Sequence, residues 1–212
     1  MQAKLPAMHG KFITFEGLDG AGKSTFIPYA QDILLRAGRQ VLLTREPGGT
    51  AMGERIRNLL LDPASELSPQ SEALLVFAAR QQHLQTVVWP ALSEGRIVLC
   101  DRFTDSTFAY QGGGRGLPVA QLEQLETWVQ GDFRPDLTLL FDVDESISQS
   151  RLRKERALDR FEQEAVEFHR RVRETYRDRA RWFPDRMRLI DAARPKDEVK
   201  VIVHKYISEF CL

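Results

Sequence analysis

The chain has 212 residues, which corresponds to one domain of ordinary size, so we expect a single domain over residues 1–212. Its 30 Lys and Arg residues balance 30 Asp and Glu residues, a charge balance that most nucleic-acid-binding proteins do not have. Cys100, Cys211 and the 4 histidines show no zinc-binding spacing, and the cysteine pattern favours a reducing, cytoplasmic location. No apolar run reaches the roughly 18 residues of a membrane span. We therefore expect neither a nucleic-acid partner nor a membrane partner.

Short apolar runs alternate along the chain with segments of helical periodicity. The expected strands are residues 12–15, 41–44, 97–100, 137–141 and 187–190. The expected helices are residues 25–37, 72–92, 119–129, 146–154 and 162–182. Strands separated by helices imply parallel pairing, because each crossover needs a long connection. The sequence therefore predicts a three-layer α/β fold with a five-stranded parallel sheet flanked by helices.

A glycine-rich motif directly follows the first expected strand and directly precedes the first expected helix. It matches the phosphate-binding pattern G-x-x-x-x-G-K-[ST] and consists of Gly17, Leu18, Asp19, Gly20, Ala21, Gly22, Lys23 and Ser24, followed by Thr25. Backbone N–H groups of such a loop and the start of the following helix bind phosphate oxygens. We expect Lys23 to bridge the β- and γ-phosphates of ATP and the Ser24 hydroxyl to bind Mg²⁺.

Nucleotide binding alone does not separate a kinase from a nucleotide-dependent switch. The N-K-x-D element of regulatory GTPases is missing from the segments after the later strands, where Asp101, Arg102 and Asp142 stand instead. Ligands of open parallel sheets bind at the carboxyl ends of the strands, where Arg45 and Glu46 are also expected. Two hypotheses stay open at this point: a small kinase with a second substrate pocket, and an ATP-driven switch or binding protein.

Two further segments offer side chains for a planar base. If the segment after the third strand is helical, Thr107, Tyr110 and Gln111 lie on one face. Phe77 and Arg80 stand three residues apart in another expected helix, so a ring and a guanidinium group are available to stack on a base and hydrogen-bond it. Core packing of that helix, with a surface arginine, is the alternative, because aromatic residues at helical spacing usually face the core.

Taken together, five segments resemble the thymidylate kinases of bacteria. They are residues 15–25, 44–50, 77–80, 101–116 and 158–162, which occur in the order of that family. The resemblance implies a P-loop kinase fold, transfer of the γ-phosphoryl group of ATP to dTMP, Mg²⁺ as cofactor, and a homodimer. A related kinase for another nucleotide or nucleoside is the alternative within this class.

The resemblance also assigns roles around the acceptor phosphate. Arg45 and Arg102 would clamp the phosphate of dTMP, because planar guanidinium groups match phosphate oxygens. Asp19 would accept a hydrogen bond from the sugar hydroxyl or orient an arginine. Asp101 is the expected metal partner, and Glu46 would hold arginines in place.

For the nucleoside, the resemblance implies contacts from several side chains of the two pocket segments. Thr107 and Gln111 would contact the edge of the thymine ring, Arg80 its carbonyl and Phe77 its face. Tyr110 would lie under the sugar, where a 2′-hydroxyl would clash, and would thereby select deoxyribose.

The family places a small lid between the fourth strand and the following long helix, here at about residues 150–161. Because the P-loop contains no arginine, the lid would supply the catalytic arginine that joins Lys23 and Arg102. Arg153 and Arg156 are both candidates, with Arg153 slightly preferred, since Arg156 occupies the position where the family often has glycine. A solvated charged helix face is the alternative interpretation of this segment.

Three other residues receive no chemical role from the sequence. Many relatives carry the stacking phenylalanine four residues before the pocket arginine, a position that Val76 occupies here. Ser106 is interpreted as a helix-capping or packing hydroxyl. His83 is interpreted as a helix residue with its hydrogen bonds satisfied, since phosphoryl transfer to a phosphate anion needs no proton abstraction.

Overall fold

A five-stranded sheet forms the centre of the computed structural model, which describes residues 9–152 and 159–212. Its strands are β1 (Lys11–Glu16), β2 (Val41–Arg45), β3 (Ile97–Asp101), β4 (Leu137–Asp142) and β5 (Met187–Asp191). Their order is β2-β3-β1-β4-β5, and every neighbouring pair is parallel. The α/β fold with a parallel sheet is therefore confirmed. Arg153 and Arg156, the two candidates for the lid arginine, lie outside the described residues.

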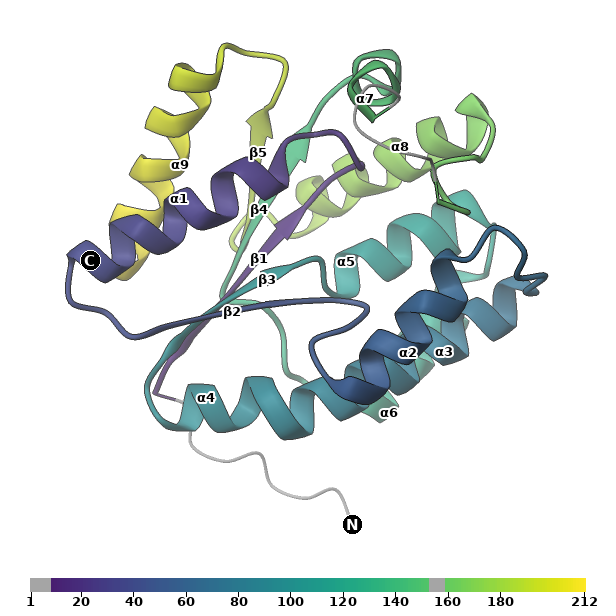
Figure 1. The fold of residues 1–212 in the computed structure, drawn as a ribbon, viewed down its shortest axis with the longest axis horizontal. Helices are drawn as coiled ribbons and strands as arrows, with labels where there is room; N and C mark the ends of the chain where they lie inside the picture. The colour runs from purple at the N-terminus through teal and green to yellow at the C-terminus, as the bar shows by residue number, and fades with distance from the viewer. Residues whose placement is uncertain (1–8, 153–158) are drawn as a thin grey trace.

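Helices lie on both sides of this sheet, as Figure 1 shows. One side carries α1 (Lys23–Arg36) and α9 (Lys196–Cys211). The other side carries α2 (Ala51–Leu61), α3 (Pro69–His83), α4 (Trp89–Ser93), α5 (Thr104–Thr107), α6 (Val119–Gln130) and α8 (Val166–Trp182). The short α7 (Glu145–Leu152) follows β4. The expected three layers are therefore present.

The helix boundaries differ from the sequence prediction in three places. The expected helix 72–92 is present as α3 and α4, joined by a π-helical turn, η1 (Leu84–Val88). A second π-helical segment, η2 (Phe108–Gly114), continues α5. The long α8 begins at Val166 rather than at residue 162, because residues 160–163 form turns. Helices α2 and α9 were not predicted.

The three central strands, β1, β3 and β4, bury both of their faces. On β1, Ile13 and Phe15 pack in the core cluster of α1 and α9. Phe12, on the opposite face of the same strand, packs with Val98 and Phe103 in a separate cluster. Burial on both faces explains why these three strands read as continuous apolar runs rather than as alternating ones.

The parallel register places the carboxyl ends of β1, β2 and β3 at one edge of the sheet. Phe15 of β1 and Arg45 of β2 both lie opposite Asp101 of β3. Directly after β1 the chain turns at Gly17, whose φ of 130° and closeness to β4 both require glycine. A Cβ there would lie 2.2 Å from the carbonyl oxygen of Phe141. The edge therefore brings the glycine-rich loop beside the charged residues after β3.

Candidate active site

The glycine-rich loop lines a pocket at the start of α1. Residues 19–25 line it, as the motif predicts. The Lys23 Nζ atom donates hydrogen bonds of 2.9 Å to the carbonyl oxygens of Gly17 and Leu18. Burial lowers the pKa of Lys23, and the positive charge of Arg102 lowers it further. The pocket thus combines backbone N–H donors, a helix N-terminus and a buried ammonium group, the elements that hold a polyphosphate.

Two oxygen-bearing side chains in this pocket suit a magnesium ion. Ser24 and Asp101 both line it. The Asp101 Oδ1 atom is buried and has no hydrogen-bond partner among the described residues. The described residues contain no group of three or more His, Cys, Asp or Glu side chains that would hold a metal by themselves. One hydroxyl and one carboxylate fit Mg²⁺, which typically takes one or two protein ligands and completes its shell with phosphate oxygens and water.

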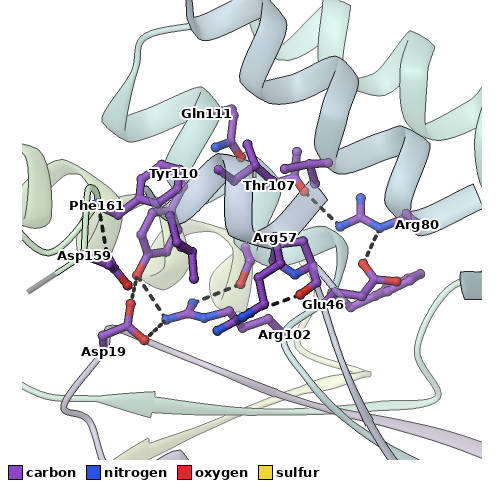
Figure 2. A pocket seen from close by; sticks show the side chains of 16 residues that line it. Asp19, Glu46, Arg57, Arg80, Arg102, Thr107, Tyr110, Gln111, Asp159 and Phe161 are labelled. Carbon is purple, nitrogen blue, oxygen red and sulfur yellow. Dashed lines mark hydrogen bonds and ion pairs between the residues drawn. The ribbon is translucent and has the colours of Figure 1, made fainter. Parts of the chain in front are cut away.

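A second pocket adjoins the first one and shares Asp19 and Arg57 with it. In Figure 2, Arg102 lies beside Asp19 and Tyr110. Arg80 lies on the other side of this cavity. Both guanidinium groups are therefore available to one ligand. Its anionic end would lie at the junction of the two pockets, which Asp19 and Arg57 line, and would face the glycine-rich loop there.

Arg102 is held at several points from the glycine-rich loop, α5, η2 and α8. Its NH2 atom donates to Asp19 Oδ1 at 2.8 Å and to the Tyr110 hydroxyl at 3.1 Å. Its NH1 atom donates to Ser106 and Tyr176 at 3.1 and 3.0 Å. Burial opposes ionisation of Asp19, but the charges of Arg102 and Lys23 outweigh it and keep the pKa of Asp19 well below its usual range. Asp19 is thus ionised and orients Arg102.

The expected face of Thr107, Tyr110 and Gln111 is present and lines this cavity. The Arg80 NH2 atom donates to Thr107 Oγ1 at 2.9 Å. Its NH1 atom is buried and has no hydrogen-bond partner in the described part of the chain. An unpaired guanidinium N–H beside a hydroxyl and an amide makes a site for a polar planar ring.

Glu46 fixes the orientation of Arg80 from the loop after β2. The Arg80 Nε atom donates to Glu46 Oε2 at 2.7 Å, and the other carboxylate oxygen lies 2.9 Å from His83 Nδ1. His83 Nε2 lies 2.6 Å from the hydroxyl of Thr44. Burial raises the pKa of Glu46, but the charge of Arg80 and the contacts with His83 together outweigh burial and give a net lowering. The interpretation of His83 as a satisfied helix residue is therefore confirmed.

The structure corrects the expected position of Phe77. This ring packs in the core with Phe108 and Leu122, while Val76 lines the cavity one position earlier in α3. Phe103 lines the cavity from the segment after β3. The residue four positions before Arg80, Val76, faces the cavity. The residue three positions before it, Phe77, faces the core.

The structure also places Arg45 differently from the expectation. Its side chain is 52% exposed and pairs with Glu54 at 2.8 Å. Arg57 of α2 instead lines both pockets and donates to the carbonyl oxygen of Pro47 at 3.0 Å. Burial lowers the pKa of Arg57, and the charges of Arg45 and Arg102 lower it further. Arg57 was missed because the sequence pattern had not predicted α2.

Comparison with known proteins gives a consistent family assignment. A family model described as thymidylate kinase matches residues 15–202. A thymidylate kinase of Nitrosospira multiformis is 52% identical over 201 residues, covering 95% of this chain and 98% of its own. One of Pseudomonas savastanoi pv. phaseolicola is 57% identical over 194 residues, covering 91% and 92%. The crystal structure of thymidylate kinase from Ehrlichia chaffeensis superposes with a TM-score of 0.76 at 38% identity, covering 94% and 98%.

Proposed function

Because this chain belongs to the thymidylate kinase family, and so is a phosphotransferase that uses ATP and dTMP, we propose that its two pockets divide the substrates between them. ATP phosphates bind in the cradle of residues 17–25, and dTMP binds in the cavity around Arg80 and Arg102. The observation that carries this assignment is that Asp19 and Arg57 line both pockets. The two substrates therefore meet end to end at the carboxyl edge of the sheet.

Positive charge at the junction suits in-line transfer between two anions. Lys23, Arg57 and Arg102 lie at or beside the shared wall of the two pockets. Their charges reduce the repulsion between donor and acceptor phosphates and stabilise the charge of the transition state. Because the acceptor is a phosphate anion, the reaction needs no general base, and positioning supplies much of the rate enhancement.

The acceptor cavity offers a separate contact for each part of dTMP. Arg102 faces the 5′-phosphate, and the unpaired NH1 atom of Arg80 faces a thymine carbonyl oxygen, as its burial at the cavity wall suggests. Thr107 and Gln111 contact the ring edge. The ring of Tyr110, which Phe161 and Phe168 touch edge-on, fills the space where a 2′-hydroxyl would lie.

We propose that Ser24 and Asp101 hold Mg²⁺, directly or through water. The buried, unpaired Oδ1 atom of Asp101 in the ATP pocket supports this assignment among the described residues. When bound, Mg²⁺ neutralises charge on the donor phosphates. Ser24 and Asp101 would determine the position of the ion, which would lie in the same pocket as Lys23.

We also propose a lid at about residues 150–161 that supplies a catalytic arginine, Arg153 or Arg156. Arg151, at the described end of α7, donates at 3.3 Å to the carbonyl oxygens of Gly20 and Ala192, so α7 already contacts the ATP pocket. A lid continuing from this helix would close over the phosphates.

A homodimer in the cytoplasm completes the proposal. Leu74 of α3 and Trp128 of α6, two neighbouring helices, are 55% and 81% exposed, which suits an interface between copies. Cys100 and Cys211 are both unpaired, consistent with a reducing compartment. Among the described helices, none combines the length and the apolarity needed to cross a bilayer.

An acceptor panel tests the substrate assignment. Release of ADP is measured with ATP and Mg²⁺ in the presence of dTMP, dUMP, dCMP, GMP or thymidine. The expected result is that dTMP gives the highest kcat/KM and that ADP release without acceptor is slow. Equal or better turnover of another acceptor would indicate a kinase for that compound, and ADP release independent of any acceptor would indicate a nucleotide-dependent switch.

A further inference from the structure

A buried carboxylate at the end of β1 joins three groups that surround Arg102. The Glu16 Oε1 atom accepts from the backbone N–H of Phe103 at 2.7 Å. Its Oε2 atom accepts from Ser106 Oγ at 2.6 Å and from the Tyr176 hydroxyl at 2.9 Å. The Glu16 side chain is fully buried and lies behind the acceptor cavity.

Ser106 and Tyr176 connect this carboxylate to the phosphate clamp. Each uses its hydrogen atom toward Glu16 and its oxygen lone pairs toward the NH1 atom of Arg102, at 3.1 and 3.0 Å. The two hydroxyls also lie 2.7 Å from each other. An ionised Glu16 accepts only, so it orients both hydroxyls with their lone pairs toward the guanidinium group.

The backbone of Arg102 needs such support. Its φ of 69° is the only positive value among the non-glycine residues that the structure describes. Left-handed backbone is strained in a residue with a Cβ atom and persists only where its surroundings hold it. The hydrogen bond from Phe103 N–H to Glu16 and that from Arg102 N–H to the Phe15 carbonyl oxygen, at 3.0 Å, clamp this turn on both sides.

We propose that Glu16, acting through Ser106 and Tyr176, is a positioning residue that presents the Arg102 guanidinium group to the acceptor phosphate. This inference rests on the proposed role of Arg102 in binding dTMP. Glu16 itself touches neither substrate pocket, so its influence on catalysis passes through the two hydroxyls. Ser106 thus acquires a role that its sequence context did not indicate.

The charges around Glu16 make this support dependent on pH. Burial and the neighbouring Asp105 raise the pKa of Glu16 to about 7, while its hydrogen bond from Ser106 and the charge of Arg102 act in the opposite direction. Asp105 is itself held ionised by Arg179 and Arg186 of the α8–β5 region. The other groups that interact electrostatically with Glu16 are Lys23, Cys100 and Tyr176.

The first test compares Tyr176→Phe with the control Thr104→Val. Thr104 is also buried, but its hydroxyl donates to Glu126 and lies outside this network. We expect Tyr176→Phe to raise the KM for dTMP about tenfold while leaving the KM for ATP within about twofold. Thr104→Val should leave both values near those of the wild type. A Tyr176→Phe enzyme that behaves like the control would overturn the proposal.

A double-mutant cycle separates positioning from general packing. In an Arg102→Ala background, Tyr176→Phe and Ser106→Ala should add less than about twofold to the loss in kcat/KM for dTMP, because the group they orient is gone. Fully additive effects would show that the hydroxyls act independently of Arg102. If the wild-type enzyme does not use dTMP at all, the proposed function fails, which is distinct from either outcome.

The pH profile supplies a readout that packing alone would not move. The ratio of kcat/KM for dTMP between wild type and Glu16→Gln cancels the titration of the acceptor's own phosphate. We expect this ratio to rise by about tenfold as the pH increases through about 7, where Glu16 ionises. A ratio that stays constant from pH 6 to pH 8.5 would overturn the role of the ionised carboxylate, and Ser106→Ala repeats the test if Glu16→Gln does not fold.

Discussion

Arg102 brings together the features on which the acceptor site depends: a left-handed backbone, an ion pair with Asp19 and hydrogen bonds to three hydroxyl groups. Its side chain is only 12% exposed, so these contacts form largely away from water, where charge-assisted hydrogen bonds are strong. A ligand phosphate that reaches Arg102 therefore meets a guanidinium group that is already oriented. Little conformational entropy is lost on binding.

Arg102→Ala should reduce kcat/KM for dTMP by about 10²–10³-fold and change ATP binding much less. The physical reason is that, in the proposed arrangement, Arg102 contacts the acceptor phosphate, whereas Lys23 and the loop amides hold the donor. Steady-state kinetics and titration with a nucleotide analogue measure the two effects. Arg170→Ala, which removes an exposed guanidinium group paired with Glu167, is the control. Comparable losses of acceptor use and ATP binding would contradict the clamp.

Tyr110→Phe should leave the preference for deoxyribose within about threefold of the wild type. In the proposed site, the aromatic ring provides the steric barrier, and its edge contacts with Phe161, Phe168 and Tyr176 do not involve the hydroxyl group. Turnover of dTMP and of its ribose counterpart measures the preference. A large gain in ribonucleotide turnover would mean that the hydroxyl, rather than the ring, selects the sugar.

Single residues also show what sequence patterns did and did not reveal. The glycine-rich motif was found at once because its function needs a fixed set of residue types in a fixed order. The sequence prediction put Phe77 in the cavity, whereas the ring lies in the core. Helical periodicity places the residues three and four positions before Arg80 on nearly the same face, so it does not tell them apart. Arg57 carried no local signal, since an arginine in a helix is ordinarily a surface residue.

Among the elements, the contact of η2 with α8 shapes the acceptor cavity. Gly113 and Gly114 of η2 lie against the side chains of Thr175 and Phe168 of α8, so closely that a Cβ atom on either glycine would clash. This close approach positions Tyr110 and Gln111 at the cavity wall. The width of the pocket therefore depends on the absence of side chains at two positions that touch no ligand.

Gly113→Ala should destabilise the protein by about 1–3 kcal/mol, because its Cβ atom would lie 2.0 Å from Thr175 Oγ1 and 2.9 Å from the carbonyl oxygen of Arg171. Gly112→Ala is the matched control, since its Cβ would meet only Leu122 Cδ1, at 3.2 Å. Urea unfolding measures the difference. Equal stability of the two variants would show that α8 moves away from η2 without cost.

Element prediction succeeded where the surroundings left a clear periodicity. The central strands β1, β3 and β4 were found because burial on both faces gives compact apolar runs. Helix α2 buries only Gly53 and Leu60 fully and leaves Met52 and Leu59 exposed, so its apolar residues do not form one clear stripe. Helix α9 does carry a buried row, Val199, Val203, Ile207 and Cys211, at four-residue spacing, and this signal was available but not used.

At the scale of the whole molecule, buried carboxylates of opposite behaviour set the response to pH. The pKa of Glu16 is raised from 4.5 to about 7, so between these values the folded state binds more protons than the unfolded one. The contribution of Glu16 to stability is therefore complete below about pH 4.5 and is lost as the pH rises through 7. The pKa of Asp105 is lowered from 3.8 to about 2. Its contribution to stability is therefore fully present above the usual aspartate pKa and is lost only as the pH falls through about 2.

The free energy of unfolding of the wild type, minus that of Glu16→Gln, should decrease as the pH rises from 4.5 to 7.5. Glutamine does not titrate, so the difference isolates the ionisation of Glu16. Urea unfolding at several pH values measures this difference, and the measurement does not depend on enzymatic activity. A difference that is constant over this range would mean that Glu16 is already ionised at pH 4.5.

Sharing of Asp19 by both pockets has a consequence for inhibitors of this enzyme. A compound that joins a thymine-like ring to a polyphosphate mimic would occupy both cavities across this one carboxylate. Escape by replacing Asp19 would release Arg102 from its ion pair and alter the surroundings of Lys23 at the same time. Drug resistance arising at this position would therefore come with a damaged enzyme, which makes the junction between the cavities a durable target.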